Sequence, residues 1–148
     1  MISPELLRRY PYFAGISDES LKEVAMMCDE VTIPAEKRIF STGDPANHLF
    51  IIVSGEVNIQ YELGSGEMRT VDTLVDGDLL VWSALIEPYK TTAEGTTTKS
   101  TQLIRIKAQD LRAMCDRDPM LGYRLAMQVA KLLAHRLEGA RVQLAAVD

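Results

Sequence analysis

The chain has 148 residues, a formal net charge of −5 and 47% hydrophobic residues, which predicts one domain with a substantial core. An acidic balance argues against nucleic acid as a direct partner, because phosphate contacts need a basic surface. No segment approaches the roughly 20 consecutive apolar residues of a membrane span. The N-terminal stretch MISPELLRRYPYF carries charges too early for a signal peptide, so we expect a cytoplasmic protein without membrane contact.

The cysteine and histidine content argues against a metal centre. Cys28 and Cys115 lie in apolar patterns without a CxxC spacing, which predicts free, buried thiols in a reducing compartment. His48 and His135 are distant in sequence, and there is no H-x-H pair and no nucleophile–base pair. We therefore expect no metal, no resident cofactor and no enzymatic activity.

Residues 1–30 predict helices. Ser3 and Pro4 are typical of a helix N-terminus, and Pro11 ends this first helix. A second helix begins at Ser17-Asp18. Its apolar face is predicted from residues that recur at helical spacing, namely Leu21, Val24, Ala25 and Cys28.

Residues 31–107 predict a β-rich unit. Short segments rich in Val, Ile and Thr alternate with turn signals at Thr42–Pro45, Ser54-Gly55, Gly64–Gly66 and Asp76-Gly77. The segment GEVNIQYEL alternates apolar and polar residues, so one of its faces should be buried. Regularly spaced strands with glycine turns favour a sandwich or a barrel.

Helical periodicity returns over residues 108–148. A short helix is expected over 108–118, and Asp118-Pro119 then begins a long one. Its first apolar line has the alternating steps of a coiled-coil seam and runs through Tyr123, Ala126, Ala130, Leu133, Leu137, Ala140 and Leu144. A second line contains Leu121, Leu125, Gln128 and Leu132. We expect the second line to cover the β-rich unit and the first to pair with a partner helix in a homodimer; the alternative is one wide face packed on its own domain.

This order of elements resembles the cyclic nucleotide-binding domain, the sensor domain of catabolite-activator-type regulators. The resemblance runs from about Phe13 to Glu138 and is carried by FAGISDESLKEVA, IPAEKRIFSTGDPANHLFIIVSGEVNI, LVDGDLLVWSALIEP and DPMLGYRLAMQVAKLLAHRLEGA. It implies a mainly β fold, a jelly-roll (double-stranded β-helix) barrel with N-terminal helices and a long C-terminal helix, forming one domain over residues 1–148. Three glycines stand where the family places turn glycines: Gly43, Gly55 and Gly77.

The segment DLLVWSALIEPYKTTAEG, Asp78–Gly95, falls on the family's phosphate-binding cassette. There a Gly-Glu pair precedes a one-turn helix, and an Arg follows; backbone N–H groups and the Arg hold the phosphate, and the Glu accepts from the ribose. In this chain the Gly is Val81 and the Glu is Trp82, whose indole cannot accept a hydrogen bond. The Arg is Thr91 or, with a shift of one residue, Lys90, which supplies a point charge without a bidentate fork.

The resemblance therefore implies a retained scaffold with a divergent phosphate site. Ser83 is expected to cap the one-turn helix, and the N–H groups of Ala84 and Leu85 to remain as donors. Lys90 and Glu94 are expected to pair with each other or to face water, and His135 and Arg136 to lie on a solvated helix face. Trp82 is interpreted as a core or pocket-filling aromatic. The candidate ligand-binding residues are Gly77, Asp78, Val81, Trp82, Ser83, Ala84, Leu85, Lys90, Thr91 and Thr92.

Two functions stay open from the sequence. The first is a small-ligand sensor that binds cAMP and cGMP weakly or not at all, because the cassette Glu and Arg are replaced. The second is a degenerate dimerisation or interaction module that binds no ligand. No helix-turn-helix follows the long helix, so we expect this chain by itself not to bind DNA.

Overall fold

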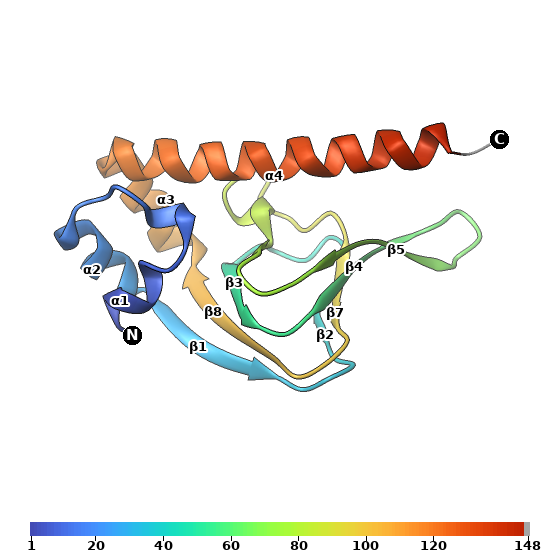
Figure 1. Ribbon diagram of the computed structural model, residues 1–148, viewed down its shortest axis with the longest axis horizontal. Coiled ribbons are helices and arrows are strands. Elements are labelled where there is room, and N and C mark those ends of the chain that lie inside the picture. The colour runs from blue at the N-terminus through green and yellow to red at the C-terminus, as the bar shows by residue number, and fades with distance from the viewer. Residues whose placement is uncertain (147–148) are drawn as a thin grey trace.

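The computed structural model describes residues 1–146. Within these residues eight strands form two four-stranded antiparallel sheets, ordered β1-β8-β3-β6 and β2-β7-β4-β5. Because most connections pass from one sheet to the other, the chain has the predicted jelly-roll arrangement (Figure 1). The sheets form two layers rather than a closed barrel. The strands are β1 Cys28–Ile33, β2 Arg38–Phe40, β3 His48–Ser54, β4 Val57–Glu62, β5 Met68–Leu74, β6 Leu79–Leu80, β7 Glu94–Thr97 and β8 Thr101–Lys107.

The helices begin where the sequence predicts them. Ser3 accepts a hydrogen bond from the Glu5 N–H, Ser17 from the Ser20 N–H, and the side chain of Asp118 caps the long helix. None of the helices within residues 1–146 is both long and apolar enough to cross a membrane. The α-helices are α1 Pro4–Leu7, α2 Asp18–Met26, α3 Ala108–Arg117 and α4 Pro119–Ala145, and the 3₁₀ helices are η1 Pro11–Phe13 and η2 Trp82–Ala84.

The boundary between the N-terminal helices and the sheets differs from the prediction. Helix α2 ends at Met26, and β1 begins at Cys28, three residues before the expected start of the β-rich unit at Val31. Cys28 pairs in register with Ile106 of β8, so strand pairing overrides the helical spacing that included this residue. The Cys28 thiol is nevertheless buried and donates to the Val24 carbonyl at 3.1 Å.

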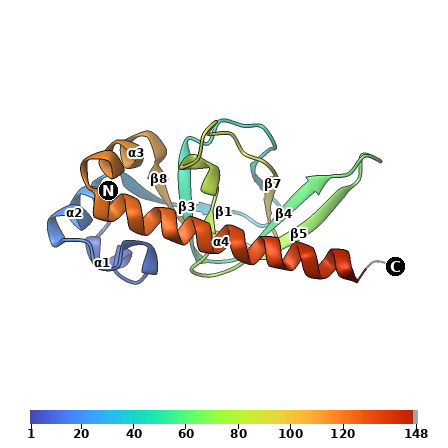
Figure 2. The same ribbon diagram turned by 90° about the horizontal axis from the view of Figure 1, so that it is seen from above.

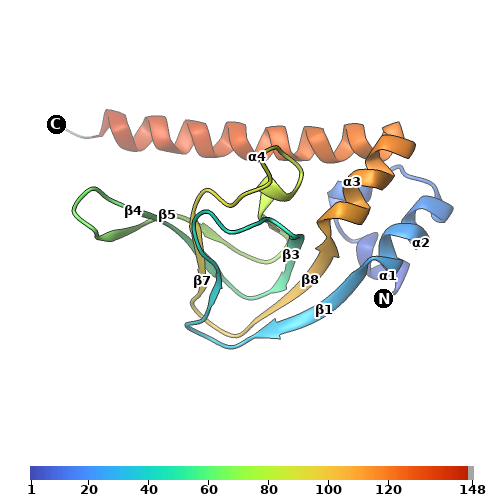
Figure 3. The ribbon, with the colours of Figure 1, turned by 180° about the vertical axis from the view of Figure 1, so that it is seen from behind.

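The core is centred on β3 and β8, which are covered on both faces. Consecutive residues of a strand point to opposite faces, and in each of these strands neighbouring residues are fully buried: Ile51 and Ile52 in β3, Leu103 and Ile104 in β8. Helix α3 contacts β3 and β8, and α2 contacts β1. Figure 3 shows α1, α2 and α3 gathered at one end of the sheets. Two sheets and a layer of helices therefore share one core.

Helix α4 crosses the whole molecule (Figure 2). Leu121 and Leu125 of the second apolar line are buried on the chain's own domain together with Val129, as predicted. Of the first line, Tyr123 is 65% exposed and Leu144 is 74% exposed. The C-terminal half of α4 lies above the β4–β5 hairpin and, as described below, does not pack tightly on it (Figure 1).

The predicted turn glycines adopt the backbone conformations that require glycine. Gly43, Gly55 and Gly77 have φ of 85°, 134° and 89°. Gly55 also lies against buried Thr101: a Cβ here would stand 2.4 Å from Thr101 Oγ1 and 2.6 Å from Thr101 Cα. Position 55 thus excludes any side chain for two independent reasons.

Candidate ligand-binding site

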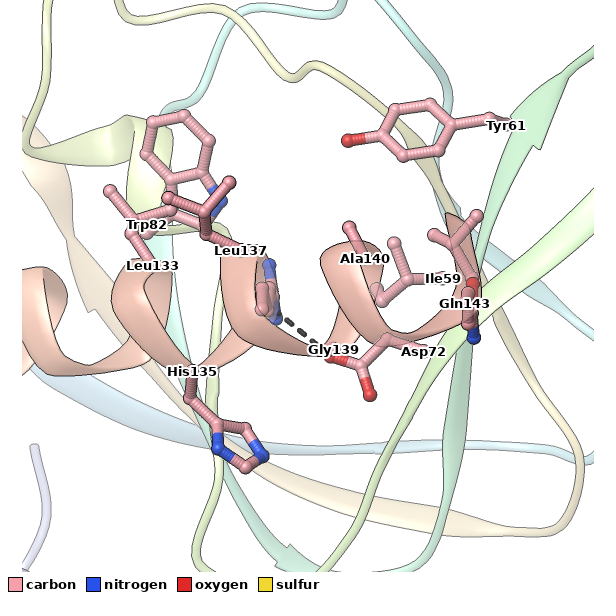
Figure 4. A pocket seen from close by; sticks show the side chains of 12 residues that line it. Ile59, Tyr61, Asp72, Trp82, Leu133, His135, Leu137, Gly139, Ala140 and Gln143 are labelled. Carbon is pink, nitrogen blue, oxygen red and sulfur yellow. Dashed lines mark hydrogen bonds and ion pairs between the residues drawn. The ribbon is translucent and has the colours of Figure 1, made fainter. Parts of the chain in front are cut away.

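A cavity of about 420 Å³ separates the C-terminal half of α4 from the β4–β5 hairpin. Figure 4 shows Leu133, Leu137 and Ala140 from the helix, Tyr61 and Ile59 from β4, and Trp82 from the turn after β6. His135 extends away from Tyr61 and Trp82 (Figure 4). Three residues of the predicted dimer seam therefore line a cavity of their own chain.

A second, much smaller cavity lies at the cassette segment, Asp78–Gly95. Its volume is about 30 Å³, and its lining includes Val81, Trp82, Thr91 and Thr92. This volume holds about two water molecules. The cassette segment therefore borders much less free volume than the space beneath α4.

Val81 has a left-handed backbone conformation of the kind that favours glycine. Its φ of 65° and ψ of 57° lie in the left-handed region, which costs a β-branched residue about 1–2 kcal/mol. Val81 lies between β6, which ends at Leu80, and η2, which begins at Trp82. Val81 rather than Ser83 is therefore the N-cap, and no side chain donates or accepts a capping hydrogen bond there.

The predicted backbone donors of the one-turn helix are used inside the turn itself. The N–H groups of Ala84 and Leu85 donate to the carbonyls of Val81 and Trp82 at 3.1 and 3.0 Å. Ser83 and Ala84 are buried. Both N–H groups therefore already have an acceptor within the turn.

The cassette residues that could contact a phosphate either bond to the protein itself or face solvent. Thr91 is buried; its hydroxyl donates to the Ser41 carbonyl and accepts from the Asp44 N–H at 2.9 Å. Lys90 is exposed, and within residues 1–146 it lines neither cavity. Thr92 is exposed at the edge of the smaller cavity. The cassette therefore supplies no cation to the cavities.

Glu94 pairs with Arg38 and not with Lys90, whereas Lys90 faces solvent, which was the other expected outcome. The Arg38 Nε lies 2.8 Å from Glu94 Oε1, and the Glu94 side chain is only 15% exposed. The pairing of β2 with β7 brings Arg38 opposite Thr96 and thus within reach of Glu94. Glu94 is neutralised from the neighbouring strand rather than from its own segment.

Gly77 and Asp78 brace the entry to β6. The Tyr12 hydroxyl donates to the Gly77 carbonyl at 2.6 Å, and Asp78 accepts from the Val75 N–H at 2.8 Å. Burial raises the pKa of Tyr12 to about 12, so the hydroxyl remains a donor across the physiological range. Gly77 and Asp78 are placed to support the turn, and they line neither described cavity.

Arg136 is the charged residue that the sequence interpretation missed. It was expected on a solvated face, but its side chain is only 22% exposed and its Nε lies 3.1 Å from Asp72 Oδ2 of β5, the dashed line in Figure 4. One signal was available: Arg136 shares a helix face with Leu132, Leu133 and Ala140, at i+4, i+3 and i−4 spacing. His135 is exposed as expected.

Arg112 of α3 contacts the cassette segment at two points. Its Nη1 donates to the Ala84 carbonyl at 2.7 Å, and its guanidinium carbon lies 4.0 Å from the centre of the Tyr89 ring. The turn is thereby tied to the helices as well as to the sheets. Among residues 1–146 there is no cluster of three or more His, Cys, Asp or Glu side chains that could hold a metal.

Comparison with known proteins identifies the family. The model of the cyclic nucleotide-binding domain matches residues 30–118. The cyclic AMP receptor protein of Thermus thermophilus is 28% identical over 134 residues, covering 90% of this chain and 60% of that protein. The CRP-like cAMP-activated global transcriptional regulator of Mycobacterium tuberculosis is 23% identical, covering 95% of this chain and 61% of that protein. The chain thus spans about three fifths of the length of these curated relatives.

A solved structure agrees over nearly the whole fold. A chain from Geobacter metallireducens GS-15, assigned to cyclic nucleotide-binding proteins, superposes with a TM-score of 0.82 at 34% identity. The match covers 93% of this chain and 99% of that one. With its two-layered jelly roll, its cassette turn and its long C-terminal helix, the chain belongs to the cyclic nucleotide-binding domain family.

Proposed function

We propose that this chain is a regulatory domain that senses a small ligand in the cavity beneath α4. The proposal rests on one observation: the cavity beneath α4 has a volume of about 420 Å³, whereas the cassette cavity has a volume of about 30 Å³. The larger volume lies within the roughly 300–1,000 Å³ range of small-molecule sites. Its lining is mostly apolar with a few polar side chains, as such sites usually are.

We also propose that cAMP and cGMP bind weakly or not at all. Trp82 offers no acceptor for a ribose hydroxyl and lines the small cassette cavity. The nearest cassette cation, Lys90, faces solvent. A cyclic nucleotide would therefore lose its hydration at the phosphate without gaining the charge-assisted hydrogen bonds that compensate for this loss.

Calorimetry tests both statements. Titration with cAMP and with cGMP should give no saturable heat below the millimolar range, and native mass spectrometry of the purified protein should find a different small molecule bound. A micromolar dissociation constant for either nucleotide would contradict the proposed selectivity. Repeating the titration with Trp82→Phe, which keeps an aromatic ring of smaller volume and removes the indole N–H, tests whether Trp82 excludes the nucleotides.

Helix α4 is suited to transmit binding, because the same helix lines the cavity and exposes apolar side chains on its outer surface. Tyr123 and Met127 are 65% and 41% exposed. We propose that these residues pack on a second copy in a homodimer, and that a ligand shifts the equilibrium between two positions of α4. Sedimentation of Tyr123→Glu, which places a charge on this surface, should show a monomer where the unaltered chain shows a dimer.

The second candidate function is a dimerisation module that binds no ligand. The small volume of the cassette cavity, about 30 Å³, supports it. The two candidates differ in one measurement: under the second, no small molecule binds in the cavity beneath α4. The net charge of −5 and the two unpaired cysteines support the further proposals of a cytoplasmic domain without nucleic-acid binding through this chain.

A further inference from the structure

From the Asp72–Arg136 ion pair we infer that the ligand in the cavity beneath α4 is an amphipathic anion, and that Arg136 binds its charged group. This inference rests on the proposed function, because it names the ligand class of the same cavity. Arg136 lines both the larger cavity and the small cassette cavity, so this residue lies where the two meet. The cation that the cassette lacks is thus provided by α4.

Arg136 has unused hydrogen-bond donors, whereas both carboxylate oxygens of Asp72 already accept a hydrogen bond. Asp72 Oδ2 accepts from Arg136 Nε at 3.1 Å, and Asp72 Oδ1 accepts from the Thr73 N–H at 2.9 Å, so each carboxylate oxygen has a donor. Arg136 has five N–H donors, and its hydrogen bonds to residues 1–146 use Nε alone. The site therefore favours an added acceptor, such as a carboxylate or sulfonate, over an added donor.

Asp72 does not block such a ligand. Its side chain is 32% exposed, so its charge remains hydrated when Arg136 turns to a ligand, and the Thr73 N–H stays as a donor. Arg136 has a similar solvent exposure of 22%, which keeps the cost of exchanging one anionic partner for another low. A ligand anion can therefore replace Asp72 as the partner of Arg136.

The remainder of the lining specifies an apolar part of the ligand. Ile59, Val71, Leu133, Leu137 and the Trp82 ring surround the volume next to Arg136. An apolar or aromatic body placed against these side chains removes hydrocarbon surface from water. A small hydrophilic anion such as inorganic phosphate gains nothing from these walls and is not expected to bind.

Two dyes that differ by one charged group test the inference. Anilinonaphthalene sulfonate carries the anion, and N-phenylnaphthylamine has the same aromatic body without it; both fluoresce more strongly in apolar surroundings. Arg136→Gln should weaken the sulfonate dye about tenfold or more and change the neutral dye by less than about twofold. Asp72→Asn should tighten the sulfonate dye alone, because the competing internal anion is gone.

The double variant Asp72→Asn/Arg136→Gln separates attraction from repulsion. It removes both charges, so its affinity for the sulfonate dye should fall below that of the unaltered chain even though no carboxylate is left to repel the dye. An unchanged ratio of the two dye affinities in Arg136→Gln and in the double variant would overturn the inference and leave the proposed function intact.

A cavity-filling pair of variants tests the site itself. Ala140→Phe fills the cavity and should abolish binding of both dyes, whereas Ala134→Phe makes the same change at an exposed position of α4 that lines no described cavity. If neither dye binds, or if Ala140→Phe leaves both affinities unchanged, the cavity is not a ligand site, and the proposed function fails together with the inference.

Discussion

Removal of the Arg112 side chain should release the cassette turn from α3 and destabilise the whole domain. The hydrogen bond to the Ala84 carbonyl, 2.7 Å long and made by a charged donor, contributes about 1.5–3 kcal/mol. The stacking on Tyr89 at 4.0 Å contributes about 0.5–1 kcal/mol. Arg112→Ala should therefore lower the free energy of unfolding by about 2–4 kcal/mol. Arg112→Lys should recover less than half of this loss, because an ammonium keeps the charge but not the planar fork.

Urea unfolding followed by tryptophan fluorescence measures this loss directly, because the chain has one tryptophan, Trp82, and it lies in the turn that Arg112 holds. Arg117→Ala is the matched control on the same helix. It breaks an ion pair with Glu23 whose side chains are 63% and 44% exposed, so it should cost no more than about 1 kcal/mol. Equal losses of unfolding free energy in the two alanine variants would refute the proposed role of Arg112 in stabilising the turn.

Three further predictions concern groups outside the cavity. The pKa of Tyr12 is raised from 10 to about 12. The stability that its hydroxyl contributes is therefore fully present below pH 10 and is lost as the pH rises through 12. Thermal melts should show the difference in stability between the unaltered chain and Tyr12→Phe disappearing over that window. Burial raises the pKa of Cys28 to about 12 and of Cys115 to about 11, so a thiol reagent at pH 8, read by peptide mass, should label Cys115 slowly and Cys28 only in urea. Gly55→Ala should cost about 3 kcal/mol or more in urea unfolding, and Gly43→Ala, with open space around it, about 1 kcal/mol.

Elements whose signal is local were predictable from the sequence. The caps at Ser3, Ser17 and Asp118 depend only on neighbouring residues, and the structure contains all three. The end of α2 was misplaced, because Cys28 fits the helical spacing while its strand pairing with Ile106 depends on residues far along the chain. Local periodicity carries no information about that partner.

The same limit explains the candidate site. The replacement at Trp82 is visible in the sequence, and so is the loss of the cassette Arg. The partner of Glu94 was not predictable, since Arg38 lies on another strand. The position of Arg136 was missed for the same reason: only the folded chain brings β5 beneath α4, and the apolar seam gave no indication that part of it lines a cavity.

The altered cassette residues depend on one another. Position 91 is buried, so an arginine there without an anionic partner would be a buried unpaired cation, which costs several kcal/mol. Thr91 avoids this cost and uses its hydroxyl to hold the loop at Ser41 and Asp44. A glutamate at position 82 would likewise meet no ribose hydroxyl and no cation from Lys90, which faces solvent. Under the proposed function, the cation that meets a charged ligand therefore comes from outside the cassette, and Arg136 of α4 borders both cavities.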